Sequence, residues 1–215
     1  MTSKFKIQNL SWLLLAAFLF TSASYAQRDV EKWKLLIALG VNKPRTDGES
    51  PGYYSEYVNF PTINIGLQHM FSHALGAKLD LGYNRSSNAD SSKEFKLNYT
   101  RVNAQMVYDF TYLLPFLPDQ IGLVAHAGPG VSMTKPLGSY ANNTYTYPNV
   151  MGGFELHYRI SRTLPIYGDA AYVYSLSNAS RYDVNTDGFS IRGDLVYAAL
   201  GLAISLDSGN GYCFY

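Results

Sequence analysis

The acidic segment that ends at Asp194 has the residue types of a calcium-binding loop. Asp183, Asn185 and Asp187 alternate along it, Gly188 follows, and Asp194 occupies the twelfth position of the pattern D-x-[DN]-x-[DN]-G-x5-E. Calcium takes oxygen ligands at alternate positions around a glycine bend. Against this, the last ligand is Asp rather than Glu, strands rather than helices are expected on both sides, and such residues are common in surface turns. Calcium binding here is a hypothesis, and we assign no metal ligands.

Histidines are the other candidates for chemistry: His69, His73, His126 and His157. The first two have the spacing of a helical metal site but flank an expected turn, where that spacing fixes no geometry. The last two lie on polar faces of expected strands, and we predict that they hydrogen-bond to the carboxylate of Asp80, Asp109 or Glu155. Because no histidine lies in a long expected loop, the sequence does not favour an enzyme. We predict no catalytic residue and no cofactor.

Eight segments after residue 26 alternate apolar with polar residues, and a period of two predicts β-strands. The clearest stretch is Thr62–Asn84, where a connection at 72–74 predicts an antiparallel hairpin with one apolar face. The remaining strands are predicted at Trp33–Val41, Tyr99–Phe110, Ile121–Met133, Val150–Ile160, Leu164–Tyr174 and Leu195–Leu206. Within the Ile121–Met133 strand, Pro129 predicts either a bulge or an unpaired position.

The connections between these strands alternate in length. Those after the first, third, fifth and seventh strands are long and polar, and those after the second and sixth are short. Eight strands with this alternation predict an all-β, closed, antiparallel barrel. Two kinds fit: a transmembrane barrel, or a soluble barrel of the lipocalin kind with its faces exchanged.

Glycine and charge decide which face lies inside. Nine strand glycines lie on the polar face: Gly40, Gly66, Gly76, Gly82, Gly122, Gly128, Gly130, Gly153 and Gly201. The interior of an eight-stranded barrel is crowded and favours small residues. The same face carries eight charges: Lys34, Lys78, Arg101, Arg159, Asp80, Asp109, Glu155 and Asp169. Facing lipid, each midplane Lys or Arg would cost about 2–4 kcal/mol, so we predict a transmembrane barrel whose lumen is plugged by ion pairs.

The apolar face is then predicted to face lipid. Aromatic residues near strand ends are expected to form its interfacial girdles: Tyr83, Tyr108, Phe110, Tyr158, Tyr172 and Tyr174. Only Gly152 and Gly168 among the strand glycines lie on this face, and they suggest either a flat contact patch or the relief of a steric clash.

The N-terminal 26 residues differ from the rest. Lys4 and Lys6 precede the apolar run Trp12–Phe20, and small residues lead to Ala26, which predicts a secretory signal peptide over 1–26. We expect the barrel over 27–206 and a short periplasmic tail over 207–215. Cys213 is the only cysteine, so no intramolecular disulfide is expected, and a net charge of +1 gives no basic surface for nucleic acid.

Three stretches, FSHALGAKLDLGYN, TRVNAQMVYDF and IGLVAHAGPGVS, resemble the eight-stranded barrel domain of OmpA/OmpX-like outer-membrane proteins, especially the Bacteroidetes-type branch. The resemblance implies a bacterial outer-membrane protein with both termini in the periplasm, surrounded by lipid and inserted by the barrel-assembly machinery. Only 207–215 follow the last strand, so the peptidoglycan-binding domain of full-length OmpA relatives, and its anchoring role, are not carried over.

The sequence indicates the function of the protein less specifically than its fold. The expected role is structural, or interaction with other outer-membrane proteins. The alternatives are a narrow ion or small-solute channel, an accessory subunit of a larger complex, and an outer-membrane lipid-modifying enzyme. A set of tyrosines expected in the outer loops is either a recognition surface or ordinary loop sequence: Tyr53, Tyr54, Tyr57, Tyr140, Tyr145 and Tyr147.

Overall fold

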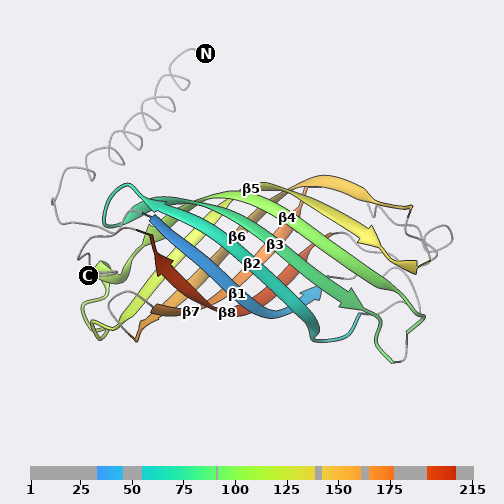
Figure 1. The fold of residues 1–215 in the computed structure, drawn as a ribbon, viewed down its shortest axis with the longest axis horizontal. Coiled ribbons are helices and arrows are strands. Elements are labelled where there is room, and N and C mark those ends of the chain that lie inside the picture. The colour runs from blue at the N-terminus through green and yellow to red at the C-terminus, as the bar shows by residue number, and fades with distance from the viewer. Residues whose placement is uncertain are drawn as a thin grey trace, which may run out of the picture.

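The computed structural model describes residues 33–45, 55–90, 92–138, 142–160, 165–176 and 193–206. The elements of these described residues are the strands β1 (Trp33–Pro44), β2 (Asn59–Met70), β3 (Leu75–Ser87), β4 (Lys96–Asp109), β5 (Ile121–Pro136), β6 (Tyr145–Arg159), β7 (Pro165–Ser175) and β8 (Leu195–Ser205), with the short 3-10 helix η2 (Thr111–Leu113) between β4 and β5. Each strand pairs antiparallel with the next, and β8 returns to pair with β1 (Figure 1). The sheet is a closed barrel, as the alternation predicted.

The barrel has two distinct ends. At one end β1 begins and β8 ends, and the connections 71–74, 110–120 and 160–164 join the strands there; we call this the terminal end. The opposite end, which carries the long connections, is the long-loop end. Among the described residues no helix has the length and apolar character needed to cross a membrane. The signal peptide over 1–26, the tail over 207–215 and Cys213 lie outside the described residues and stay predictions.

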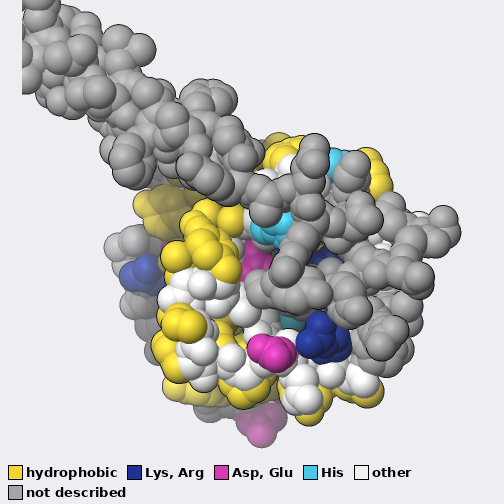
Figure 2. Space-filling view, turned by 90° about the vertical axis from the view of Figure 1, so that its left-hand side faces the viewer, with side chains coloured by type: hydrophobic (Ala, Val, Ile, Leu, Met, Phe, Trp, Pro, Cys, Tyr) yellow, Lys and Arg dark blue, Asp and Glu magenta, His cyan; other side chains and the backbone are white. Residues whose placement is uncertain are grey.

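Burial alternates along every strand with the predicted parity. The apolar face is the exposed one: Ile65, Leu79 and Leu200, for example, are 44 %, 55 % and 76 % exposed. Viewed from the terminal end, yellow hydrophobic side chains lie along the upper, left and lower edges, outside polar and charged groups nearer the centre (Figure 2). The predicted girdle residues Tyr108, Tyr158 and Tyr174 are on this outer face.

The two outer-face glycines do not adjoin each other. Gly152 pairs with Tyr172, whereas Gly168 pairs with Leu156, so four ladder positions separate them on β6 and β7. A methyl group at Gly152 would meet no atom closer than 3.8 Å, and at Gly168 none closer than 3.4 Å. Neither glycine is required by a close contact.

On the β4 side Pro129 leaves an unpaired position and not a bulge, whereas on the other side it pairs with Val150 of β6. Asn103 pairs with Gly130 and Met106 with Ala127, so the β4–β5 register is the same on both sides of the proline. The two intervening pairs of the ladder are missing. Since proline has no N–H to donate, the ladder is interrupted locally while the inward and outward parity is kept. A one-residue register shift does occur in the β1–β2 ladder, between Gly40 and Asn42.

β6 begins earlier than predicted, at Tyr145 rather than Val150. A proline at position 148 lies inside this strand. However, in an antiparallel strand the N–H and C=O of one residue point to the same neighbour, and the carbonyl of Pro148 accepts from Leu176, beyond the last β6–β7 pair at Asn149 and Ser175. The missing N–H therefore falls past the end of the β7 ladder, and the strand continues on its β5 side.

Candidate functional site in the barrel lumen

The centre of the lumen is occupied by Arg101 of β4, which has no exposed surface. Its guanidinium forms an ion pair with Asp80 of β3 and donates to Asn64 Oδ1 at 2.9 Å. The same group lies over the ring of Tyr197 of β8, 4.8 Å from the ring centre. Arg101 thus contacts strands on opposite sides of the barrel.

A second chain of contacts continues from Tyr197. Its hydroxyl donates to Asp169 of β7 at 2.8 Å, and Asp169 contacts His126 Nε2 of β5 at 3.1 Å. The other ring nitrogen, Nδ1, lies 2.5 Å from Gln105 Oε1. Both imidazole nitrogens of His126 therefore face side-chain oxygens of neighbouring strands.

A third contact set also crosses the lumen. Lys78 Nζ of β3 is 2.5 Å from Glu155 Oε1 of β6, with both side chains almost fully buried. Glu155 Oε2 is 2.7 Å from His157 Nε2, and the His157 ring stacks on Tyr167 with centres 5.2 Å apart. We call the residues of these three contact sets the ionic layer: Asn64, Lys78, Asp80, Arg101, Gln105, His126, Glu155, His157, Tyr167, Asp169 and Tyr197.

Between the ionic layer and the terminal end lies an apolar cluster. Met70, Val107 and Val124 pack together there, each at most 5 % exposed. At the rim itself, Asp109 accepts from the backbone N–H of Thr111 at 2.9 Å and so fixes the turn that starts η2. The terminal end of the lumen is therefore closed by packing as well as by charge.

Toward the long-loop end the lumen is lined by neutral polar groups. Asn42 of β1 donates to Thr62 Oγ1 at 3.0 Å, and Thr62 donates to Asn84 Oδ1 at 2.9 Å. Ser86 Oγ donates to Asn42 Oδ1 at 2.9 Å. These four side chains are all at most 3 % exposed.

A second neutral group lies on the next strands. Tyr99 and Ser132 hydroxyls are 2.6 Å apart, Asn149 Nδ2 donates to Ser132 Oγ at 2.7 Å, and Asn103 Nδ2 donates to Asn149 Oδ1 at 2.6 Å. Together with the preceding group they form what we call the neutral layer: Asn42, Thr62, Asn84, Ser86, Tyr99, Asn103, Ser132 and Asn149. The sequence placed polar residues on this face but gave no sign of a separate uncharged layer.

Seven of the eight charges predicted inside the lumen are buried there. The exception is Arg159, for which the prediction was wrong: it is the last residue of β6, only partly buried, and its guanidinium donates to the Asp119 carbonyl at 2.7 Å. The alternation along β6 predicted the correct face of the sheet for Arg159. At the end of the strand, however, its long side chain reaches the rim of the barrel instead of the interior.

Two further predictions need correction. His157 bonds to Glu155 as expected, but His126 bonds to Asp169, which was not among its predicted partners. The reason is Gly153, which pairs with His126: a methyl group there would lie 2.8 Å from His126 Nε2, so its absence lets the ring reach β7.

Tyr147 was predicted in an outer loop and is instead a lumen residue of β6. It is 3 % exposed, and its hydroxyl is 2.8 Å from Thr134 Oγ1. Tyr145 also belongs to β6, whereas Tyr57 is 81 % exposed with Lys43 Nζ 3.5 Å from its ring centre. Tyr53, Tyr54 and Tyr140 lie outside the described residues.

Within the described part of the chain, one set of side chains has the spacing of a metal site: His126, Glu155 and Asp169, whose ligand atoms lie within 4.8 Å of one another. Their nitrogen and oxygen atoms already contact Lys78, Gln105 and Tyr197. A metal would have to displace these partners in a fully buried place, so we interpret the set as part of the ionic layer.

Most of the residues in the predicted calcium-binding loop, 183–192, lie outside the described residues. Asp194 is described, and its carboxylate accepts from the Ser175 N–H and the Tyr172 hydroxyl, both at 2.9 Å. Arg45 Nη1 is 3.9 Å from the same group. These contacts tie Asp194 to the barrel wall, and calcium binding by the loop stays a prediction.

The closed barrel, the apolar outer wall and the charged lumen together define an integral membrane β-barrel. A family model described as "Outer membrane protein beta-barrel domain" matches residues 12–192, and the chain belongs to this family. The OmpA-like resemblance and the outer-membrane assignment are thereby confirmed at the level of the family. A search of curated proteins found no match.

Solved structures with this fold come from several bacteria. Neisserial surface protein A is 12 % identical with a TM-score of 0.58, covering 81 % of this chain and 97 % of that one. A major outer membrane protein from Thermus thermophilus is 11 % identical with a TM-score of 0.51, covering 80 % and 98 %. OprG from Pseudomonas aeruginosa is 9 % identical with a TM-score of 0.50, covering 82 % and 98 %. At such identities the likeness is one of fold alone.

Proposed function

We propose that this protein is a plugged outer-membrane barrel with a structural or protein-interaction role, rather than a channel or a catalyst. The observation that carries the proposal is the ionic layer. There Arg101 of β4 contacts both β3 and β8, and Lys78 of β3 forms an ion pair with Glu155 of β6. An eight-stranded barrel has an interior that side chains just fill. Steady conduction would require these buried ion pairs to separate.

The proposed orientation places the terminal end in the periplasm and the long loops outside the cell. Transmembrane barrels of this type have short periplasmic turns and longer extracellular loops, and the terminal end carries the two shortest connections, 71–74 and 160–164. In this orientation the long connections are the surface available to partners outside the cell, and the outer wall is available to other outer-membrane proteins.

Conductance measurement tests the plug. The purified protein is reconstituted in planar bilayers, and a porin in the same bilayers serves as the positive control. We expect no steady single-channel steps at neutral pH. The altered mobility of the unboiled protein on electrophoresis verifies that the barrel is folded. Regular conductance steps from folded wild-type protein would contradict the proposal and favour the narrow channel.

The interaction role needs a different experiment. A tag placed after Leu206, at the end of the described chain, allows mild purification from native outer membranes. A stoichiometric larger complex would identify the barrel as an accessory subunit. A single small species would favour a stand-alone structural protein.

A further inference from the structure

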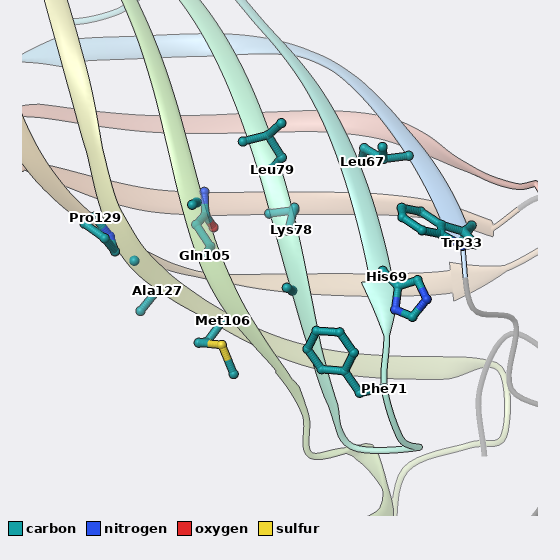
Figure 3. Close-up of a pocket in the computed structure, with 13 residues that line it drawn as sticks. Trp33, Leu67, His69, Phe71, Lys78, Leu79, Gln105, Met106, Ala127 and Pro129 are labelled. Carbon is teal, nitrogen blue, oxygen red and sulfur yellow. The ribbon is translucent and has the colours of Figure 1, made fainter.

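The outer wall is not uniform, because a groove crosses it over β1 to β5. It has a volume of about 670 Å³, and its walls and floor are almost entirely apolar. Ala77, Ala104 and Ala127, on three consecutive strands, provide the small residues of its floor. Leu79 and Met106 stand beside them, and both are more than half exposed (Figure 3).

The groove runs obliquely across the outer wall, from the terminal end toward the long-loop end. Its lower end is at the terminal rim, where Trp33 is the first residue of β1 and Phe71 follows the last residue of β2. Its upper end is at Pro129, eight residues after the start of β5. At about 3.3 Å per residue and a tilt near 40°, that is roughly 20 Å above the terminal end. The interruption of the β4–β5 ladder beside Pro129 lies at this upper end.

The two ends of the groove differ chemically. The upper end is apolar, with Ala127, Pro129 and Met106 (Figure 3). The lower end contains His69, whose ring lies edge-on to Trp33 with centres 4.4 Å apart. His69 Nδ1 is buried and has no hydrogen-bond partner among the described residues. Trp at this level of a membrane protein marks the boundary between hydrocarbon and headgroups.

We propose that this groove binds a glycerophospholipid, with one acyl chain lying along the alanine floor and the polar end beside His69. The groove is continuous with the lipid-facing wall, where Leu67, Leu79 and Met106 border it, so membrane hydrocarbon is the surrounding medium. An apolar path with one polar end matches an alkyl chain with its headgroup at that end, beside His69. The choice of phospholipid rests on the proposed orientation, because the rim at Trp33 then lies in the periplasmic leaflet.

Retention of lipid after detergent exchange tests the proposal. Intact-complex mass spectrometry should find one phospholipid per wild-type barrel. Ala104→Phe and Ala127→Phe fill the floor and should reduce the retained fraction at least tenfold. Ala170→Phe is the matched control, since Ala170 is also exposed on the outer wall but lies on β7 outside the groove; it should retain lipid as the wild type does. No retained phospholipid in the wild type, or equal retention in all variants, would overturn the proposal.

A titration of the unaltered protein gives an answer even if a groove variant fails to fold. Trp33 is the only tryptophan of residues 27–215. Brominated phospholipid added to the delipidated protein in detergent should quench its fluorescence saturably, with an end point near one lipid per barrel. Quenching that rises linearly without saturation would mean simple partitioning and would reject the site. Saturation by lipopolysaccharide but not by phospholipid would reject the proposed occupant and the proposed orientation, while leaving the conductance result untouched.

Discussion

The ionic and neutral layers of the lumen are both buried and both hydrogen-bonded, but they connect the barrel differently. In the ionic layer, Lys78 and Glu155 join β3 to β6, and Arg101 and Tyr197 join β4 to β8 on the opposite wall. In the neutral layer, bonds such as Asn42 to Thr62 join strands that are one or two apart. The charged contacts therefore close the lumen, whereas the neutral contacts reinforce the wall.

The difference follows from side-chain length and charge. Lys and Arg can cross the interior of a small barrel, and a buried cation must find an acid because its unpaired burial is costly. Asn, Ser and Thr are too short to cross, so they bond to the adjoining strands. We therefore expect mutations in the ionic layer to cost more stability than mutations in the neutral layer.

The largest effect is expected at the centre of the ionic layer. Arg101→Met removes the guanidinium and leaves Asp80 buried without its cation, so we expect the free energy of unfolding to fall by about 3–5 kcal/mol. Urea unfolding from lipid vesicles measures it. Adding Asp80→Asn to the same variant removes the orphaned charge and should restore part of the loss. A double variant no more stable than Arg101→Met would argue that packing, not charge, is the cause.

Two neighbouring glycines of β6 allow the crowded lumen to be compared with the open outer wall, because Gly153 faces the lumen and Gly152 faces outward. A methyl group at Gly153 would lie 2.5 Å from Ala171 Cβ and 2.6 Å from the Ala170 carbonyl oxygen, whereas at Gly152 it would meet nothing within 3.8 Å. Gly153→Ala should therefore destabilise the barrel by about 1–3 kcal/mol, and Gly152→Ala by less than about 0.5 kcal/mol. The same urea titration measures both. Equal effects would mean that the lumen adapts more easily than its contacts indicate.

The neutral layer is tested at Ser132, which contacts both Tyr99 and Asn149. Ser132→Ala removes two short hydrogen bonds and leaves their partners buried, for an expected loss of about 1–3 kcal/mol. We expect a value in the lower half of that range, because the two partners keep other neighbours in the layer, and therefore a smaller loss than at Arg101. Thermal unfolding followed by electrophoretic mobility is sufficient. A loss equal to that of Arg101→Met would remove the distinction between the layers.

Sequence periodicity was sufficient to predict the barrel, because a period of two fixes which face each residue occupies once the strands are found. It placed Lys78, Arg101 and Glu155 inside correctly. It did not predict which of these residues would meet, because pairing across a lumen depends on strand tilt and on gaps such as the one at Gly153. Those properties come from closure of the barrel and are absent from any single strand.

Strand ends were the other source of error. Tyr147 was assigned to the long polar connection before the predicted Val150–Ile160 strand, and Arg159 was placed in the lumen because the inward and outward alternation was extended to the last residue. At the ends, a missing N–H can fall outside the ladder and a long side chain can turn to the rim. The groove on the outer wall was also not predicted, since it arises from small residues on three strands that are far apart in sequence.

The smallest effect is expected for an ion pair at the surface. Lys96 Nζ and Glu94 Oε1 are 3.6 Å apart, but the two side chains are 49 % and 80 % exposed. Because water screens such a pair and both side chains lose freedom on pairing, Lys96→Ala should change stability by less than about 1 kcal/mol. Measuring the free energy of unfolding at low and high salt distinguishes this exposed pair from the buried ion pairs more sharply. Salt should weaken the exposed pair but leave the cost of Arg101→Met nearly unchanged, since buried charges are screened much less. A cost at Arg101 that vanishes in high salt would mean that ions and water enter the lumen, and the plug would then have to be described as open.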